Sequence, residues 1–395
     1  MNTAKGAVLV SGASIAGPAV AFWLRRHGFS VTVVEKAGAL RGGGYPIDIR
    51  GTALEVVRRM GILPRLRAAH IETQLLTFVD DGGGEVASLH PQTVTGGVEG
   101  QDVEIRRGDL AEVLYEVTRD DVEYVFDDSI ATLTEHEHGV EVTFRGGARR
   151  DFDLVLGADG LHSRTRELVF GSEHKFHRYL GYCFAGFTMP DKFGLSQEGV
   201  LWNTPGRGAA LYAVKGSDKV HGFLVAARPE PPRELLRDPE AQRDLVASTF
   251  AGDGWEIPVM IAALREADDL FFDTVSQIHL LSWSRGRIGL VGDAAYAPSF
   301  LTGQGTSLAL VGAYMLARSL AVHRDHADAF AAYEAETRPF VELNQAQVGV
   351  GDAALFPVTA EALARRNKRL RGLSTSAPET GRPAHTALAL PDLSF

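Results

Sequence analysis

The chain has 395 residues, enough for one large domain or two smaller ones that each bury a hydrophobic core. Apolar residues make up 45% of the chain and charged residues 23%, and the formal net charge of −10 argues against general nucleic-acid binding. The single cysteine excludes an intramolecular disulfide and a cysteine-rich metal site, so no metal is expected. No uninterrupted apolar run reaches the ~18 residues of a membrane span, and no signal peptide precedes the first predicted strand. A cytoplasmic protein without a membrane partner is therefore expected.

The first predicted unit is a strand, a helix that starts near Ala16, and a second strand. Between the first strand and the helix, Gly12 permits a tight turn and Gly17 lets the helix pack closely on the strand. Ser14 stands where a third glycine is usual, and its hydroxyl is available to a phosphate oxygen. The free N–H groups at the start of such a helix attract a phosphate. The unit therefore predicts a dinucleotide-binding turn.

Glu35 ends the second strand, near the ~20-residue spacing at which a carboxylate accepts hydrogen bonds from an adenosine ribose. A carboxylate in this place disfavours a 2′-phosphate, so the nucleotide held here is not expected to be NADPH. The neighbouring Lys36 is included among the expected contacts. The alternative is an ordinary strand–turn–helix unit with a surface glutamate.

The middle of the chain alternates helices, hairpins and an aromatic-rich sheet. A hairpin is predicted where Leu75–Val79 and Val86–Leu89 flank a glycine-rich turn, and a buried strand at 152–156 leads to Asp159. From 181 to 227 the pattern changes to repeated strands rich in aromatic residues. Helices are predicted at 51–60, 108–118, 233–250, 256–266, 304–321, 326–347 and 358–372.

A second glycine signature follows the apolar strand that ends at Val291. Asp293 directly after this strand can accept hydrogen bonds from a ribityl hydroxyl, although a plain helix N-cap is the alternative. Beyond Pro298, the glycines Gly303 and Gly305 let backbone approach a flat ring, and the helix behind them directs its N-terminus at that ring. A helix N-terminus stabilises the negative charge of a reduced flavin. The two signatures together predict FAD held at both of its ends.

These elements predict an α/β fold in which a Rossmann-like FAD-binding domain is interleaved with a mainly β substrate domain, followed by C-terminal helices. The FAD-binding parts are expected at 1–74, 101–176 and 281–350, a substrate-domain hairpin at 75–100, the substrate-binding sheet at 177–280, and a C-terminal helix and tail at 351–395. The tail from Ser374 is expected to lie loosely on the surface.

In their order along the chain, the motifs resemble the class A flavoprotein monooxygenases with the para-hydroxybenzoate hydroxylase fold. The short bacterial members that tailor polyketides or inactivate tetracyclines are the most similar, and the resemblance covers about residues 5–350. It implies that Arg107 at a helix start contacts FAD and that Asp159 belongs to a motif shared by FAD and NAD(P)H contacts. It also implies that Arg41 and Asp48 lie in a mobile loop near flavin and nicotinamide. The predicted cofactor contacts are Gly12, Ser14, Ala16, Gly17, Glu35, Lys36, Arg41, Arg107, Asp159, Asp293, Pro298, Gly303 and Gly305, with Asp48 at the nicotinamide.

Two departures from the family pattern are Ser14 in the first turn and Ser307, which stands where many members carry asparagine. The resemblance implies that NAD(P)H, as a transient co-substrate, reduces the flavin, and that O2 then forms a flavin C4a-hydroperoxide. This species hydroxylates an aromatic or polyketide-like small molecule, in antibiotic biosynthesis or resistance. The alternatives are a flavin oxidase or dehydrogenase, a halogenase on the same fold, or a non-catalytic FAD- or drug-binding protein. A monomer or homodimer is expected.

The middle sheet is expected to form the substrate wall, because apolar aromatic pockets suit flat multi-ring ligands. Alternate residues of a strand face opposite sides, so about half of the candidates are expected to point inward. No general base is identified. The candidate wall residues are Tyr45, Phe184, Phe187, Trp202, Tyr212 and Phe223.

Overall fold

A computed structural model describes residues 5–40, 42, 44–213, 216–348, 355–373 and 378–392. Its first sheet has six strands in the order β17-β18-β11-β1-β2-β7, all parallel except for the antiparallel edge strand β17. This parallel order is the Rossmann-like core expected from the sequence. The strands are β1 (Ala7–Ser11), β2 (Ser30–Glu35), β7 (Glu123–Phe126), β11 (Leu154–Gly157), β17 (Ser284–Arg285) and β18 (Ile288–Leu290).

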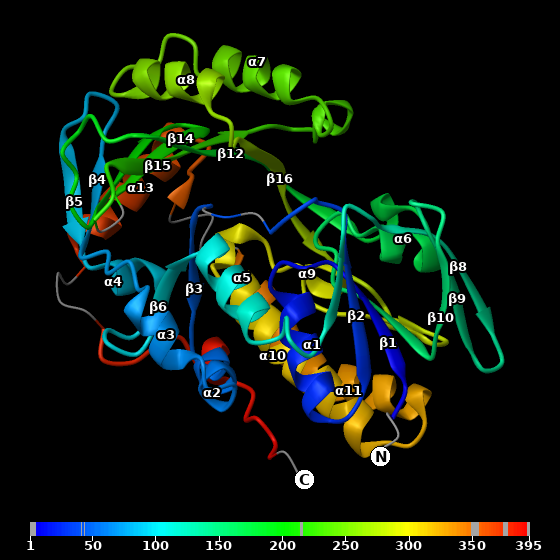
Figure 1. The fold of residues 1–395 in the computed structure, drawn as a ribbon. Helices are drawn as coiled ribbons and strands as arrows, with labels where there is room; N and C mark the ends of the chain where they lie inside the picture. The colour runs from blue at the N-terminus through cyan, green and yellow to red at the C-terminus, as the bar shows by residue number, and fades with distance from the viewer. Residues whose placement is uncertain are drawn as a thin grey trace.

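Both faces of the first sheet are covered, which explains why its strands are apolar almost throughout. On one face, Val8 and Val10 pack with the helices α1 (Ala16–Arg26), α10 (Gly305–Val322) and α11 (His326–Gln345) (Figure 1). On the other face, residues such as Leu9 pack against a three-stranded sheet. That sheet consists of β8 (Ile130–His136), β9 (Gly139–Phe144) and β10 (Arg149–Phe152), beside α6 (Arg164–Phe170).

The second sheet has seven strands in the order β16-β12-β15-β14-β13-β4-β5. Its last two strands come from a distant part of the chain: β4 pairs in parallel with β13, with Leu76 opposite Gly199. The strands are β4 (Leu75–Val79), β5 (Glu85–Leu89), β12 (His177–Pro190), β13 (Glu198–Thr204), β14 (Arg207–Ala213), β15 (Lys219–Ala227) and β16 (Phe271–Ile278).

The two faces of the second sheet have different neighbours (Figure 1). The outer face is covered by α7 (Pro239–Thr249) and α8 (Ile257–Glu266), whose apolar residues form one core with it. The inner face is turned toward the first sheet, and α13 (Ala360–Arg371) packs on its β4–β5 end through Leu370. The inner face of the seven-stranded sheet therefore forms one side of the region between the two large sheets.

A small two-stranded sheet of β3 (Pro46–Ile49) and β6 (Val103–Arg106) lies between the two larger units (Figure 1). The remaining helices of the described residues are short. They are α2 (Thr52–Arg59), α3 (Leu63–Ala68), α4 (Pro91–Thr95), α5 (Arg107–Glu116), α9 (Asp293–Tyr296), and the 3-10 helices η1 (Glu173–Lys175), η2 (Arg233–Leu235), η3 (Phe300–Thr302) and η4 (Pro383–Thr386).

Two local predictions differ from the structure. The helix predicted at 233–250 is divided, because the Asp238 side chain caps α7 by accepting a hydrogen bond from the Ala241 amide (3.1 Å). The C-terminal tail does not lie loosely: within 378–392, His385 is buried and the Leu388 carbonyl accepts a hydrogen bond from the Thr52 hydroxyl (2.7 Å). The tail therefore packs against α2.

Helix α10 is the one helix in the described part of the chain that is long and apolar enough to cross a membrane. However, 78% of that stretch is buried inside the protein, where it packs against α1 and α11. A helix that is apolar on all sides is expected in such a central position.

Candidate active site

The first glycine turn is shaped by two close backbone approaches. A Cβ on Gly12, whose φ is +108°, would lie 2.5 Å from the carbonyl oxygen of Ala158 at the end of β11. A Cβ on Gly17 would lie 1.8 Å from the Gly12 carbonyl oxygen. Helix α1 begins without a side-chain cap and without an acidic residue in its first turn. Its N–H groups are therefore available to an anion.

Arg107 extends across this turn from the start of α5. Its Nη2 donates a hydrogen bond to Ser14 Oγ at 2.8 Å. The structure thus brings together two of the predicted cofactor contacts, although 93 positions separate them. The serine that replaces the usual glycine orients a positive charge beside the helix N-terminus.

Glu35 is fixed at the edge of the same turn. Its Oε2 accepts a hydrogen bond from the Ala13 amide and its Oε1 one from the Ala37 amide, both at 2.9 Å. Each carboxylate oxygen keeps further accepting capacity, which a ribose hydroxyl could use. The adjacent Lys36 is exposed.

The second glycine signature touches the first. A Cβ on Gly292, whose φ is +66°, would lie 2.9 Å from Ala16 Cβ in the first turn of α1. Asp293 follows at the start of α9, and a Cβ on Gly305 would lie 3.8 Å from Asp293 Oδ1. Burial raises the pKa of Asp293, while the positive charge of Arg107 opposes this shift. The acid, the arginine and both glycine turns therefore form one site.

The residues present fit FAD on two observations. First, glycines stand where a Cβ would collide with neighbouring backbone or side chains, so both turns pack directly against the uncapped start of α1, where the N–H groups available to a phosphate lie. Second, the fully buried Gln304 side chain, between Gly303 and Gly305, has no hydrogen-bond partner for either amide atom within the described ranges. Buried amides without a partner are uncommon and indicate unused hydrogen-bonding capacity at this loop.

Asp159 borders the first glycine turn through its backbone, and Pro298 contacts β16. A Cβ on Gly12 would lie 3.1 Å from Asp159 Cα, whereas the Asp159 carboxylate accepts hydrogen bonds from Ser163 and Thr165 at the start of α6. The Pro298 carbonyl accepts a hydrogen bond from Gln277 Nε2 (3.1 Å), which ties the late loop to β16. The predicted contact Arg41 lies outside the described residues.

Asp48 lies against the late glycine loop together with a partner that the sequence analysis missed. Arg50 Nη2 is 2.7 Å from Asp48 Oδ2, and a Cβ on Gly303 would lie 3.1 Å from Arg50 Nη1 and 3.7 Å from Asp48 Oδ2. Ser307, in the place of the family's asparagine, accepts a hydrogen bond from the Arg50 amide (3.1 Å). This serine therefore holds β3 against the start of α10.

Three acids, Asp48, Asp102 and Glu104, form a carboxylate cluster around Arg50. Asp48 is opposite Glu104 in the β3–β6 ladder, and Asp102 Oδ2 is 3.7 Å from Arg50 Nε. Burial and the nearby Asp48 raise the pKa of Glu104 to about 7, and burial also raises the pKa of Asp48. The signal in the sequence was the i, i+2 spacing of Asp48 with Arg50 and of Asp102 with Glu104, because extended backbone directs residues at this spacing to the same side.

The inner face of the second sheet carries a contiguous set of aromatic rings. Phe223 lies 5.9 Å from Tyr45 and 6.1 Å from Tyr212 between ring centroids, and Phe184 lies 5.4 Å from Phe271. The Arg107 amide donates a hydrogen bond to the Tyr45 carbonyl (3.2 Å). Tyr45 is therefore held beside Arg107, one of the predicted FAD contacts. The candidate wall is therefore continuous with the glycine loops.

Phe187 and Trp202 do not belong to this wall. Both are almost fully buried on the outer face, at 3% and 1% exposure, in the core that includes α7 and α8. Phe187 is three positions from Phe184, so the alternation of a strand directs the two rings to opposite faces. The structure removes both residues from the candidate wall and leaves Tyr45, Phe184, Tyr212 and Phe223, to which it adds Phe271.

Both ring nitrogens of His162 are engaged by carboxylates, so this histidine is not available as a general base. Its Nδ1 is 2.9 Å from Glu173 and its Nε2 3.0 Å from Asp273 on β16. Although burial opposes the charge, the hydrogen bonds to these two acids raise the pKa of His162 to about 10. A protonated imidazole therefore links the first unit to the second sheet.

The chain belongs to the FAD binding domain family, whose profile matches residues 5–347. It is 46% identical over 344 residues to the uncharacterized protein Rv1260 of Mycobacterium tuberculosis (strain ATCC 25618 / H37Rv), with 86% of this chain and 91% of that protein covered. It is 40% identical to a flavin-dependent monooxygenase of an unknown prokaryotic organism, with 94% and 96% covered. The crystal structure of tetracycline destructase Tet(55) matches with a TM-score of 0.84 at 37% identity, covering 99% of this chain and 100% of that one.

These comparisons confirm the fold and the cofactor class expected from the sequence. The protein is an FAD-dependent monooxygenase, an oxidoreductase of the class that its motifs resembled.

Proposed function

We propose that the protein uses NAD(P)H and O2 to hydroxylate an aromatic or polyketide-like small molecule bound against the inner face of the second sheet. The observation that supports this proposal is the close approach of the two glycine signatures at Ala16 and Gly292, beside an aromatic wall that Tyr45 joins to Arg107. The bound flavin would supply the redox chemistry and the activation of O2.

In this proposal the residues of the chain hold and orient the cofactor. The N-terminus of α1 and Arg107 neutralise the pyrophosphate, Glu35 accepts hydrogen bonds from the adenosine ribose, and Asp293 accepts one from the ribityl chain. Asp48, which lies against the late loop, would contact the nicotinamide. The remaining proposed contacts are Gly12, Ser14, Ala16, Gly17, Lys36, Arg41, Asp159, Pro298, Gly303 and Gly305.

The wall residues have two roles in the proposal. The apolar rings of Phe184, Phe223 and Phe271 bind a flat substrate by its faces, and they exclude water from the reacting flavin. The similarity to a tetracycline destructase at 37% identity supports a polyketide-like ring system as the substrate class. The fungal relative asL6 of Sarocladium schorii, an FAD-dependent monooxygenase 34% identical to this chain, supports the monooxygenase reaction over an oxidase or a halogenase.

The test is oxygen incorporation by the purified yellow protein. NAD(P)H oxidation is followed with and without a panel of phenols and tetracyclines, and products are analysed after reaction under isotopically labelled O2. Substrate-stimulated oxidation with one labelled oxygen in the product supports the proposal. Anaerobic bleaching of the flavin by substrate without NAD(P)H refutes it in favour of an oxidase, and tight substrate binding without turnover refutes it in favour of a binding protein.

A further inference from the structure

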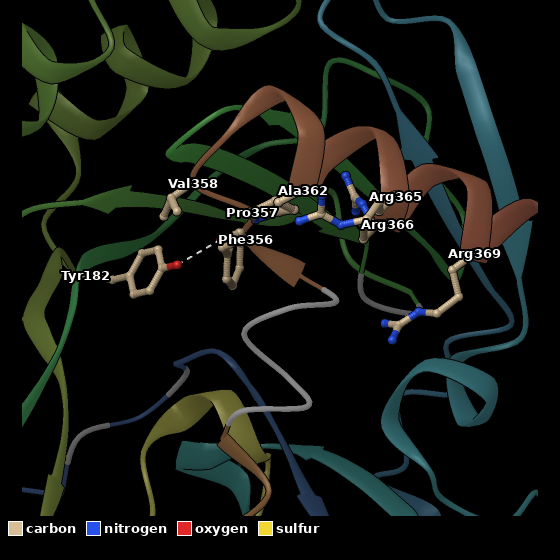
Figure 2. A pocket seen from close by; sticks show the side chains of 8 residues that line it. All are labelled: Tyr182, Phe356, Pro357, Val358, Ala362, Arg365, Arg366 and Arg369. Atoms are coloured by element: carbon tan, nitrogen blue, oxygen red, sulfur yellow. Dashed lines mark hydrogen bonds between the residues drawn. The ribbon is translucent and has the colours of Figure 1, made fainter.

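A cavity of about 330 Å³ lies between α13 and the inner face of the second sheet, outside the proposed flavin site. Figure 2 shows aromatic and apolar side chains at one end and three arginines of α13 along the other, two on one turn of the helix and the third on the next. It is lined by Tyr182, Phe356, Pro357, Val358, Ala362, Arg365, Arg366 and Arg369. No acidic residue is among these lining residues, and the nearby Glu361 interacts electrostatically with Arg365 alone of the three arginines, so the lining carries a net positive charge.

Arg366 is the buried member of the three arginines, with 3% exposure. Its Nη2 donates to Asn203 Oδ1 at 2.9 Å, but neither Nε nor Nη1 has a hydrogen-bond partner in the part of the chain that the structure describes. Burial and the nearby Arg369 lower the pKa of Arg366 to about 10. A buried charge with unused donors is costly, and an anion in the cavity would remove that cost.

Arg365 and Arg369 extend the positive charge toward the solvent. They are four positions apart on α13, so they lie on one face of the helix, and both side chains are exposed. Within the described ranges, none of the ion pairs with an N···O distance of 4.0 Å or less involves Arg365, Arg366 or Arg369. Like charges spaced in this way repel each other, and an anion bound between them would offset that repulsion. Guanidinium groups bind carboxylates through two parallel hydrogen bonds.

The other end of the cavity suits an aromatic ring. Tyr182 and Phe356 have their ring centroids 6.4 Å apart, and the Tyr182 hydroxyl donates to the Phe356 carbonyl (2.9 Å). Both belong to the same apolar cluster as Phe184 of the proposed wall. A volume of this size is at the lower end for small-molecule sites, which limits the ligand to one or two rings.

We propose that this cavity is a binding site for a small aromatic carboxylate, with the ring between Tyr182 and Phe356 and the carboxylate at the arginines. Residues of α13, of the segment before it and of the second sheet make the site. The inference therefore goes beyond the monooxygenase activity, and it does not depend on where the flavin binds or on which compound is hydroxylated.

The test is calorimetric titration of the full-length, flavin-loaded protein with naphthoate, a two-ring aromatic carboxylate. The neutral naphthamide and inorganic phosphate serve as the uncharged and ring-free probes. Arg365→Gln and Arg369→Gln each remove a charged donor, so each is expected to weaken naphthoate binding about tenfold. Arg371→Gln is the matched control, because this exposed arginine is on the same helix but does not line the cavity. It is expected to leave the affinity unchanged.

The proposal is supported if naphthoate binds, if naphthamide and phosphate bind at least tenfold more weakly, and if Arg365→Gln and Arg369→Gln weaken naphthoate binding while Arg371→Gln does not. It is overturned if naphthoate fails to bind at millimolar concentration, or if naphthamide or phosphate binds equally well. Equal losses in Arg371→Gln and Arg369→Gln would also overturn it, because they would show a general charge effect. All of these results are binding data, so they are independent of whether the protein hydroxylates any compound.

Discussion

Gly17→Ala gives a direct test of the first turn. A Cβ at this position would lie 1.8 Å from the Gly12 carbonyl oxygen, whereas a carbon atom normally stays about 3.3 Å or more from a carbonyl oxygen. The start of α1 must therefore move by roughly 1.5 Å away from β1, because the obstructing atom belongs to the backbone. Overpacking of this kind costs about 3 kcal/mol. For 395 residues the entropy of unfolding is about 0.8 kcal/mol/K, so Tm of the flavin-free protein falls by about 4 °C.

The same displacement takes the helix N–H groups away from the proposed pyrophosphate position. Loss of one or two hydrogen bonds to a charged group raises the Kd for FAD about tenfold to a hundredfold. The assays are thermal unfolding and fluorescence titration of the flavin-free protein with FAD. Gly254→Ala is the matched control, since a Cβ there would lie 3.6 Å from the nearest atom, at an ordinary contact distance. Unchanged Tm and FAD affinity in Gly17→Ala would refute the reasoning.

Three further predictions concern single positions. Asp293→Ala should yield mostly colourless protein by visible absorbance, whereas Asp244→Ala, at an exposed acid on α7, should stay yellow; equal flavin contents would contradict the proposed ribityl contact. Phe187→Ala should lower the free energy of unfolding by about 4 kcal/mol in denaturant unfolding, because Phe187 lies in the core of the outer face. Phe223→Ala, on the inner face, should mainly raise KM for the substrate. The reverse pattern would contradict the assignment of the two rings to opposite faces of the second sheet. For Glu104, whose folded pKa of about 7 exceeds its ordinary 4.5, the native state binds the proton more tightly, so stability falls as pH rises through this window. Glu104→Gln should therefore raise Tm by about 4 °C above pH 7 and leave it unchanged near pH 4. A difference in Tm that is constant with pH would contradict the raised pKa of Glu104.

The parts of the site predicted from the sequence are those that depend on local geometry. Gly12, Gly17 and Gly292 mark places where the backbone itself needs a residue without a Cβ, and such requirements are visible in the spacing of a strand, a turn and a helix. Ser14 and Arg107 were each predicted as cofactor contacts, but the hydrogen bond between them appears only in the structure.

The parts that were missed depend on pairing between distant segments. The carboxylate cluster exists because β3 pairs with β6, and no local pattern shows that Asp48 will be opposite Glu104. The alternation of the strands predicted that some aromatic candidates would face outward, but only the position of α7 and α8 shows that Phe187 and Trp202 do. The tail was misjudged because composition says nothing about the surface of α2, on which it packs.

The position of β4 and β5 at the far edge of the second sheet has a consequence for protein engineering. The chain leaves the first sheet to form this hairpin, returns, and leaves again before it forms β13, the strand that pairs with β4. During synthesis more than a hundred residues must be added after the β4–β5 hairpin before β13 is present to pair with β4. Until then the edge of β4 is unpaired, and an exposed strand edge is prone to aggregation. Exchange of the second sheet between related proteins therefore requires two separate segments to be replaced, the β4–β5 hairpin and the segment from β12 to β16. Replacement of the later segment alone would pair the hairpin of one protein with the sheet of the other.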